Sequence, residues 1–212
     1  MYYGIIKSIW KRKDRNLALE KPFLSLPLIH ERTVPSCQTG FMITIPIEDC
    51  NSFSQKTYDD YVFGLQPHMM ECKCGRCGGL IFYGRYERHL KILGLFLSFI
   101  IQRVRCSFCG KTHALIPSLI VPYSQIPRED QQEILKLNEE GKSAKPVFDR
   151  NCQIDESHMR HIIRRYKRFW KERILSLGLS LSDRLTEACL SVYSLQFMQI
   201  HRTWNSYFSP PT

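Results

Sequence analysis

The chain has 212 residues and is 43% hydrophobic, which allows one or two packed domains and argues against wholesale disorder. Lysine and arginine total 30 against 20 acidic residues, and the net charge of +10 favours nucleic acid or a membrane surface as partner, unless it serves solubility alone. The most apolar run, Ile92 to Ile101, is too short to cross a bilayer, and the charged N-terminus does not fit a signal peptide. We therefore expect a cytoplasmic protein with no membrane partner.

The chain contains nine cysteines, an odd number that fits a disulfide framework poorly. Two pairs have the C-x-x-C spacing that is typical of metal ligands in a reducing compartment. The cysteines without such pairing are interpreted as ordinary core or surface thiols: Cys37, Cys50, Cys152 and Cys189.

Residues 1–41 show no clear period and are predicted to be an irregular N-terminal extension. Two interpretations stay open: the working protein begins near Met42, or the preceding residues are an ordinary irregular region. Residues 41–47 have the pattern of a short strand, which opens a predicted domain at 42–127.

From Cys72 to Tyr123 the pattern is that of β structure. Apolar stretches at 80–86 and 95–104 are predicted to be strands on either side of a turn near Gly94.

The strongest signal is a pair of cysteine knuckles, Cys74 with Cys77 and Cys106 with Cys109, each followed by glycine. Zn²⁺ prefers four soft ligands in a tetrahedron, and two C-x-x-C turns supply two thiolates each. The length between the knuckles fits a zinc ribbon, in which a β-hairpin separates them and metal binding supplies much of the folding free energy. Because four thiolates leave no open position, we expect one structural zinc ion and no catalytic metal.

Other interpretations of these cysteines are four free buried thiols or a redox pair, and the matched spacing disfavours both. Two nearby residues are potential ligands. Cys72 would replace Cys74 if the first turn were remodelled, and His113 lies four residues beyond Cys109. We interpret both as bystanders.

After residue 127 the apolar period becomes helical, and 128–175 is predicted to form a helix-turn-helix. Its first helix ends near Gly141, because glycine readily adopts the left-handed stop. A short second helix is expected at 144–149, with Ser143 as its cap.

The third helix begins after Asp155, a good N-cap, and is predicted to continue to about Leu175. Residues 176–212 are predicted to be a C-terminal tail that is helical from Leu181 to Trp204.

The third helix is predicted to have one apolar face that packs on the domain and one basic face. A recognition helix needs this division, because its outer face enters the major groove of DNA and meets phosphates. Met159, Ile162 and Tyr166 recur at three- and four-residue intervals and form an apolar stripe. The predicted base-facing residues are Ser157, His158, Arg160, His161 and Arg164, and the predicted phosphate-binding residues are Arg165, Lys167, Arg168 and Lys171. The alternative interpretation is a solvated basic face.

Several short motifs between residues 70 and 170 carry a family resemblance. They are Gly84-Arg85-Tyr86, Arg103-Val104-Arg105-Cys106, Cys109-Gly-Lys-Thr-His113-Ala-Leu-Ile-Pro117 and Val121-Pro122-Tyr123. The segment resembles uncharacterised zinc-ribbon proteins of bacterial mobile elements, whose N-terminal parts are similar to the DNA-binding heads of insertion-sequence transposases. In those heads a ribbon of this kind is followed by a helix-turn-helix.

The resemblance stops short of catalysis. Such transposases continue into a nuclease domain with three carboxylates around two metal ions, whereas Asp183 and Glu187 are the acidic residues after Glu172 here. The resemblance therefore implies DNA binding without the nuclease chemistry, and we expect no enzymatic activity.

The predicted fold class is α+β, with a small β zinc ribbon followed by an all-α helix-turn-helix region and a C-terminal helix. The predicted function is that of a zinc-containing protein that binds double-stranded DNA. It would act as a mobile-element accessory or as a transcriptional regulator. The alternative is a protein–protein interaction module or a non-catalytic subunit of a transposition complex, with a homodimer or a transposition protein as partner. The sequence shows no exposed aromatic platform of the kind that RNA-binding modules use.

Overall fold

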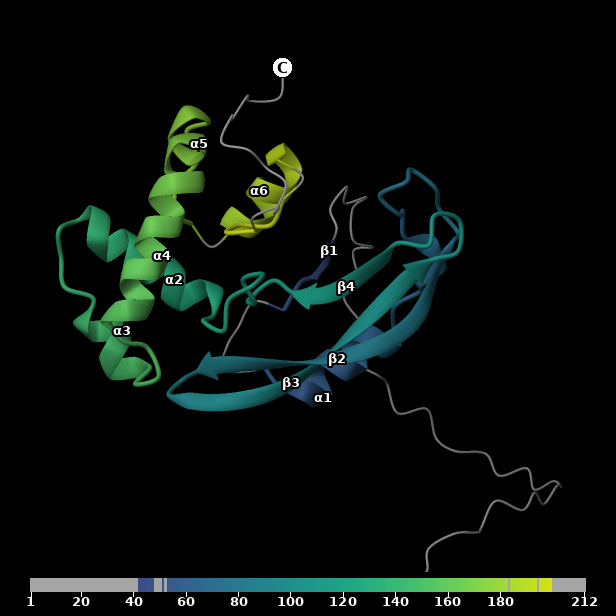
Figure 1. The fold of residues 1–212 in the computed structure, drawn as a ribbon, viewed down its shortest axis with the longest axis horizontal. Coiled ribbons are helices and arrows are strands. Elements are labelled where there is room, and N and C mark those ends of the chain that lie inside the picture. The colour runs from purple at the N-terminus through teal and green to yellow at the C-terminus, as the bar shows by residue number, and fades with distance from the viewer. Residues whose placement is uncertain (1–41, 48–50, 52, 183, 194, 200–212) are drawn as a thin grey trace, which may run out of the picture. The chain divides into compact units, whose positions relative to one another are not determined.

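The computed structural model describes residues 42–47, 51, 53–182, 184–193 and 195–199, all within one compact unit of the chain (Figure 1). The first part contains these elements: β1 (Met42–Ile45), α1 (Gln55–Phe63), the 3₁₀ turn η1 (Pro67–Met69), β2 (Leu80–Ile92), β3 (Leu95–Cys106) and β4 (Thr112–Pro117). The second part is helical: α2 (Arg128–Glu139), α3 (Lys145–Arg150), α4 (Glu156–Phe169), α5 (Lys171–Ser176) and α6 (Leu185–Tyr193). The α+β class is therefore confirmed.

The strands form one four-stranded sheet in the order β1-β4-β3-β2. β2, β3 and β4 are antiparallel neighbours, whereas β1 pairs with β4 in parallel, with Ile43 opposite Leu115. The β2–β3 hairpin turns at Leu93 and Gly94, whose φ angles of 49° and 75° are those of a tight primed hairpin turn. The predicted turn near Gly94 is thus confirmed, and both strands are longer than predicted.

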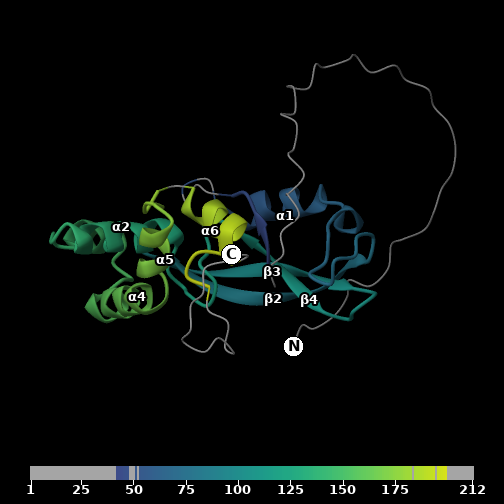
Figure 2. The ribbon, with the colours of Figure 1, turned by 90° about the horizontal axis from the view of Figure 1, so that it is seen from above.

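α1 lies on one side of the sheet and was missed by the sequence analysis (Figure 2). Ser54 caps it by accepting a hydrogen bond from the backbone N–H of Thr57 at 3.0 Å. Tyr58 is fully buried; its hydroxyl donates to the Leu115 carbonyl and accepts from the Gln102 N–H, both at 2.8 Å. This one side chain therefore ties α1 to the backbones of β3 and β4.

The buried apolar residues form two clusters that divide between Ile120 and Val121. The first contains the strands and α1, and the second contains the helices α2 to α6. Among the described residues no helix combines the length and the apolar character that a membrane span requires.

The predicted helix ends hold where a local signal marks them. α2 ends at Glu139 before Gly141, whose φ is +69°, and Asp155 caps α4. At α3 the N-cap is Ala144, and the hydroxyl of Ser143 accepts a hydrogen bond from the Lys145 N–H instead of capping the helix.

The predicted continuous helix from Asp155 to Leu175 is wrong at Trp170, where α4 stops and α5 begins. Trp170 is 1% exposed and packs edge-on against Tyr193 and Phe197. The free energy gained by burying this side chain therefore outweighs the cost of interrupting the helix.

The C-terminal helix is also shorter than predicted. α6 ends at Tyr193, and the described residues after it form a turn in which Phe197 and Met198 are fully buried. These apolar residues enter the helical core from a turn instead of from a helix face. Trp204, the predicted end of this helix, lies outside the described residues.

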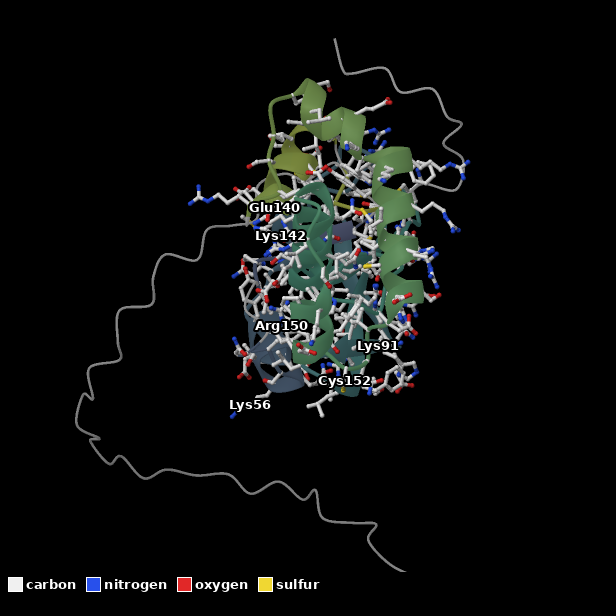
Figure 3. All side chains as sticks on the ribbon, turned by 90° about the vertical axis from the view of Figure 1, so that its left-hand side faces the viewer. Lys56, Lys91, Glu140, Lys142, Arg150 and Cys152 are labelled. Atoms are coloured by element: carbon white, nitrogen blue, oxygen red, sulfur yellow. The ribbon has the colours of Figure 1, made fainter. Side chains whose placement is uncertain are left out.

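The tip of the β2–β3 hairpin is attached to the turn between α3 and α4 (Figures 1 and 3). Asn151 in that turn is fully buried. Its amide nitrogen donates to the Lys91 carbonyl at 2.9 Å and to the Asp130 carboxylate at 2.8 Å, and its amide oxygen accepts from the Gly94 N–H at 3.2 Å. Arg150 contacts the same Asp130 carboxylate at 2.6 Å. This polar network fixes the hairpin tip against α2 and the start of α4.

Candidate metal centre and basic helix face

Four cysteines at the opposite end of the hairpin from its tip form the candidate metal centre. The sulfur atoms of Cys72, Cys74, Cys106 and Cys109 all lie within 4.8 Å of one another. Two of the separations are 3.6 Å, between Cys72 and Cys109, and 3.9 Å, between Cys74 and Cys106. Four thiolates held tetrahedrally at the usual Zn–S length of ~2.3 Å would be about 3.8 Å apart. The group is therefore compact enough to hold a metal ion.

Two similar backbone turns bring these sulfurs together. In each turn a glycine follows the second cysteine in a left-handed conformation, with φ of +79° at Gly75 and +70° at Gly110. The N–H of each glycine donates to the carbonyl of the first cysteine, from Gly75 to Cys72 at 2.8 Å and from Gly110 to Cys106 at 2.9 Å. A side chain with a Cβ would strain this conformation, so glycine is required at both positions.

The cluster differs from the predicted ligand set by one residue, because it contains Cys72 and not Cys77. Cys72 is 2% exposed, whereas Cys77 is exposed and is not in the cluster. The cause is the first turn, which closes between Cys72 and Gly75 as Cys-x-Cys-Gly. The sequence contained a signal for this, since Cys74-Gly75 repeats the Cys109-Gly110 pair as well as Cys77-Gly78 does.

The thiols of the cluster differ in acidity. Burial on its own raises the pKa of Cys106, but hydrogen bonds from the backbone of Cys109 and Phe108 outweigh it and lower the pKa to about 7. Burial raises the pKa of the Cys72 thiol instead. A cation between the sulfurs would favour the thiolate form of both, which is the charge state that a metal ligand needs.

His113 is not a member of the four-cysteine cluster, but it contacts one of the cysteines. It is 2% exposed, and its Nε2 lies 3.3 Å from the Cys72 sulfur. An imidazole at this distance can hydrogen-bond to a ligating thiolate and hold it in place. Of the other cysteines, Cys152 is exposed and Cys189 is buried among the helices, while Cys37 and Cys50 lie outside the described residues.

The second candidate site is the outer face of α4. Asp155 caps the helix, accepting from the backbone N–H of His158 at 2.9 Å. Ile162 and Tyr166 are buried on the inner face, and the Tyr166 hydroxyl donates to Glu139 of α2 at 3.0 Å. α4 is therefore held against α2 along one side only.

Six of the nine predicted DNA-binding residues are exposed: Ser157, Arg160, His161, Arg164, Lys167 and Arg168. Four of these are basic residues at spacings of four, three and one, so they follow one face of the helix. In Figure 3 nitrogen-bearing side chains project from the outer side of α4.

Arg165 was predicted to bind phosphate, but it is buried within the protein. It is 9% exposed, and its guanidinium donates to the carbonyl oxygens of Met198 and Pro122. Its position in the helix places it beside Ile162 and Tyr166, where segments distant in sequence cover it. Arg165 is therefore a structural link between α4 and the segment after α6.

Three further predicted contacts have partners within the protein. Arg160 lies 3.4 Å from the Glu156 carboxylate, one turn earlier in α4. Lys171 lies 3.8 Å from the Glu139 carboxylate. His158 lies between Asp155, at 2.7 Å from its Nδ1, and the Lys91 ammonium, at 2.9 Å from its Nε2. The backbone N–H of Asp155 also donates to Nδ1 of His158 at 3.3 Å, which completes a capping box at the start of α4. His158 thus joins the hairpin tip to the start of α4.

Residues 72–162 match the model of a family described as a domain of unknown function, DUF6431. That range includes the cysteine cluster, the β2–β3 hairpin and the first half of α4. The match ties the chain neither to zinc ribbons nor to transposases. No curated protein and no solved structure matches the chain.

Proposed function

We propose that this chain is a zinc-stabilised protein that binds double-stranded DNA through α4. The observation that carries the proposal is the division of α4 into a buried face and a basic exposed face. On the exposed face Arg160, Arg164 and Arg168 follow one another at four-residue spacing. Such a row is long enough to meet base edges at its start and phosphates further along.

The arrangement of the neighbouring helices supports this proposal. α2, the short α3 and α4 follow one another in the order of a helix-turn-helix, and α4 is the helix that would enter the major groove. The start of α4 is held by the Asp155 cap and by the contact between His158 and Lys91. A helix fixed at this end loses little conformational freedom when it binds.

In this proposal the cysteine cluster has a structural role. Cys72, Cys74, Cys106 and Cys109 would hold one zinc ion, which joins the two ends of the β2–β3 hairpin in the manner of a zinc ribbon. Four thiolates would complete the coordination, so the ion would stabilise the fold and take no part in a reaction. The resemblance to transposase heads favours a mobile-element accessory or a transcriptional regulator.

Replacing Arg164 with alanine is expected to weaken binding to the preferred duplex about tenfold, because an arginine that grips guanine contributes about 1–3 kcal/mol. The duplex is first obtained by selection from a random pool, and its dissociation constant is then measured by fluorescence anisotropy. Arg184→Ala is the matched control, since Arg184 is an exposed arginine at the start of α6. An equal loss of affinity in both variants, or none in either, would contradict a specific role of α4.

A further inference from the structure

Aromatic rings and arginines form two groups at the cysteine end of the hairpin: Tyr83 and Tyr86 with Arg103 and Arg105, and Phe108 with Arg76. Tyr86 and Arg103 are half-buried and the other four are exposed. We call the two groups together the arginine–aromatic face. The Arg103 guanidinium lies 5.8 Å from the ring centres of both Tyr83 and Tyr86, and that of Arg105 lies 5.3 Å from Tyr83. Arg76 lies 5.3 Å from the ring centre of Phe108. All four distances are within the range of cation–π attraction.

A β-bulge in β2 and the register of β3 set the positions of Tyr83 and the two arginines of β3. The register of β2 against β3 shifts between Phe82 and Gly84, so Tyr83 is the extra residue of a β-bulge. Arg103 and Arg105 are two positions apart in β3, so their side chains lie on the same face of the sheet. Tyr83 is 51% exposed although it is a large ring, which leaves about half of its surface open to a partner.

Phe108 is held by a close approach to the backbone. It is 52% exposed, and a Cβ on Gly79 would lie only 2.4 Å from a carbon of its ring. The ring therefore rests directly on the Gly79 backbone, in a place that only glycine allows. A ring fixed in this way loses little freedom on binding a ligand.

A cavity of about 770 Å³ continues from this face toward the segment 122–125. Tyr86 and Arg103 line it together with Arg88 and His89. Arg88 is occupied, because its guanidinium donates to the carbonyls of Val121 and Ser124 at 2.7 Å. The Nε of Arg103 is buried and has no hydrogen-bond partner among the described residues. Because Arg103 lines the cavity, its remaining guanidinium nitrogens are the ones that can donate to an anionic ligand.

We propose that the arginine–aromatic face binds single-stranded nucleic acid, with unpaired bases stacked on Tyr83 and Phe108 and phosphates held by Arg103 and Arg105. Aromatic rings need the open face of a base, which a stacked duplex does not offer, so the rings favour a single strand over a duplex. This face corrects the expectation that the chain has no exposed aromatic platform.

The face is separate from α4. β2 has 13 residues, which at about 3.3 Å each span ~40 Å between the cysteine end and the tip beside α4. The two surfaces can therefore bind different parts of one nucleic acid, and the inference does not depend on duplex binding by α4.

The test uses the full zinc-loaded chain and a fluorescein-labelled oligothymidylate of about 12 nucleotides, within the site size of single-strand-binding modules. Tyr83→Ala and Phe108→Ala are each expected to raise its dissociation constant roughly tenfold, since each removes a stacking ring. Tyr83→Phe keeps the ring and is expected to keep the affinity. The matched control is Phe96→Ala, which removes a ring of similar exposure, 54%, near the hairpin tip.

The inference is overturned if the unaltered chain does not bind the oligothymidylate. It is also overturned if both alanine variants bind as the unaltered chain does, or if Phe96→Ala weakens binding equally. Zinc content and circular dichroism confirm that each variant is folded; if an alanine variant is not, Tyr83→Leu, which keeps an apolar side chain without the ring, replaces it with the same expected loss. Arg184→Ala, at an exposed arginine outside both surfaces, is expected to leave binding of the oligothymidylate unchanged. Duplex binding by Arg164→Ala is measured separately, so failure of the proposed function is distinguished from failure of this inference.

Discussion

Replacing Cys72 with serine is expected to abolish zinc binding by the cysteine cluster and to unfold the hairpin half of the protein. A structural zinc site contributes about 10 kcal/mol or more to folding, and a whole domain is stable by only about 5–15 kcal/mol. The Cys72 sulfur is 3.6 Å from that of Cys109 and is buried, so serine would remove a ligand from the centre of the cluster. Zinc content of the purified chain and thermal unfolding followed by circular dichroism measure the two effects.

Cys77→Ser is the matched control for this prediction. Cys77 is exposed and outside the cluster, so its variant is expected to keep one zinc ion per chain and to unfold at the temperature of the unaltered protein. The opposite result, with zinc lost from Cys77→Ser and kept by Cys72→Ser, would restore the ligand set that the C-x-x-C spacing predicted.

The second large effect is expected for Asn151→Ala, which should lower the free energy of unfolding by about 3 kcal/mol. The substitution leaves the Lys91 carbonyl and the Gly94 N–H without their partner, and each unsatisfied buried group costs about 1–3 kcal/mol. It also removes one of the hydrogen bonds to Asp130. Urea denaturation of the zinc-loaded protein gives the change directly.

Gln153→Ala serves as the comparison for Asn151→Ala. Gln153 lies in the same turn and is exposed, so its truncation is expected to change the free energy of unfolding by less than about 0.5 kcal/mol. If Asn151→Ala were as mild as this control, the hairpin tip would not depend on the network for its attachment to the helices.

The parts of the fold that were predictable from sequence are those marked by short-range signals. Asp155 supplies the side-chain oxygen that a helix start needs, and Gly141 and Gly94 fit the left-handed positions of a helix end and a hairpin turn. The exposure of most arginines of α4 was predicted from the three- and four-residue spacing of the apolar residues on the opposite face. Each of these features depends on residues within a few positions of one another.

Two of the features that the sequence did not predict depend on contacts between distant segments, and a third, the ligand set, depends on a local turn. The parallel pairing of β1 with β4 joins residues near 43 to residues near 115, and no local pattern indicates it. Arg165 follows Arg164 directly in α4, so the local sequence does not distinguish them. Only Arg165 is buried, because the segments that contain Pro122 and Met198 pack over it and accept its hydrogen bonds. Cys72 was named as a potential ligand and then set aside, because the C-x-x-C spacing gave more weight to Cys77 than to the glycine after Cys74.

The proposal that α4 reads DNA sequence is tested by selecting bound sequences from a random duplex library, at near-physiological salt and with the zinc-loaded chain. We expect enrichment of a defined motif for the unaltered protein and its loss for Arg160→Ala or Arg164→Ala, with Arg184→Ala selecting the original motif. Binding that falls with salt but enriches no motif would leave only the electrostatic attraction of a basic surface. That result would contradict the proposal that α4 reads DNA sequence.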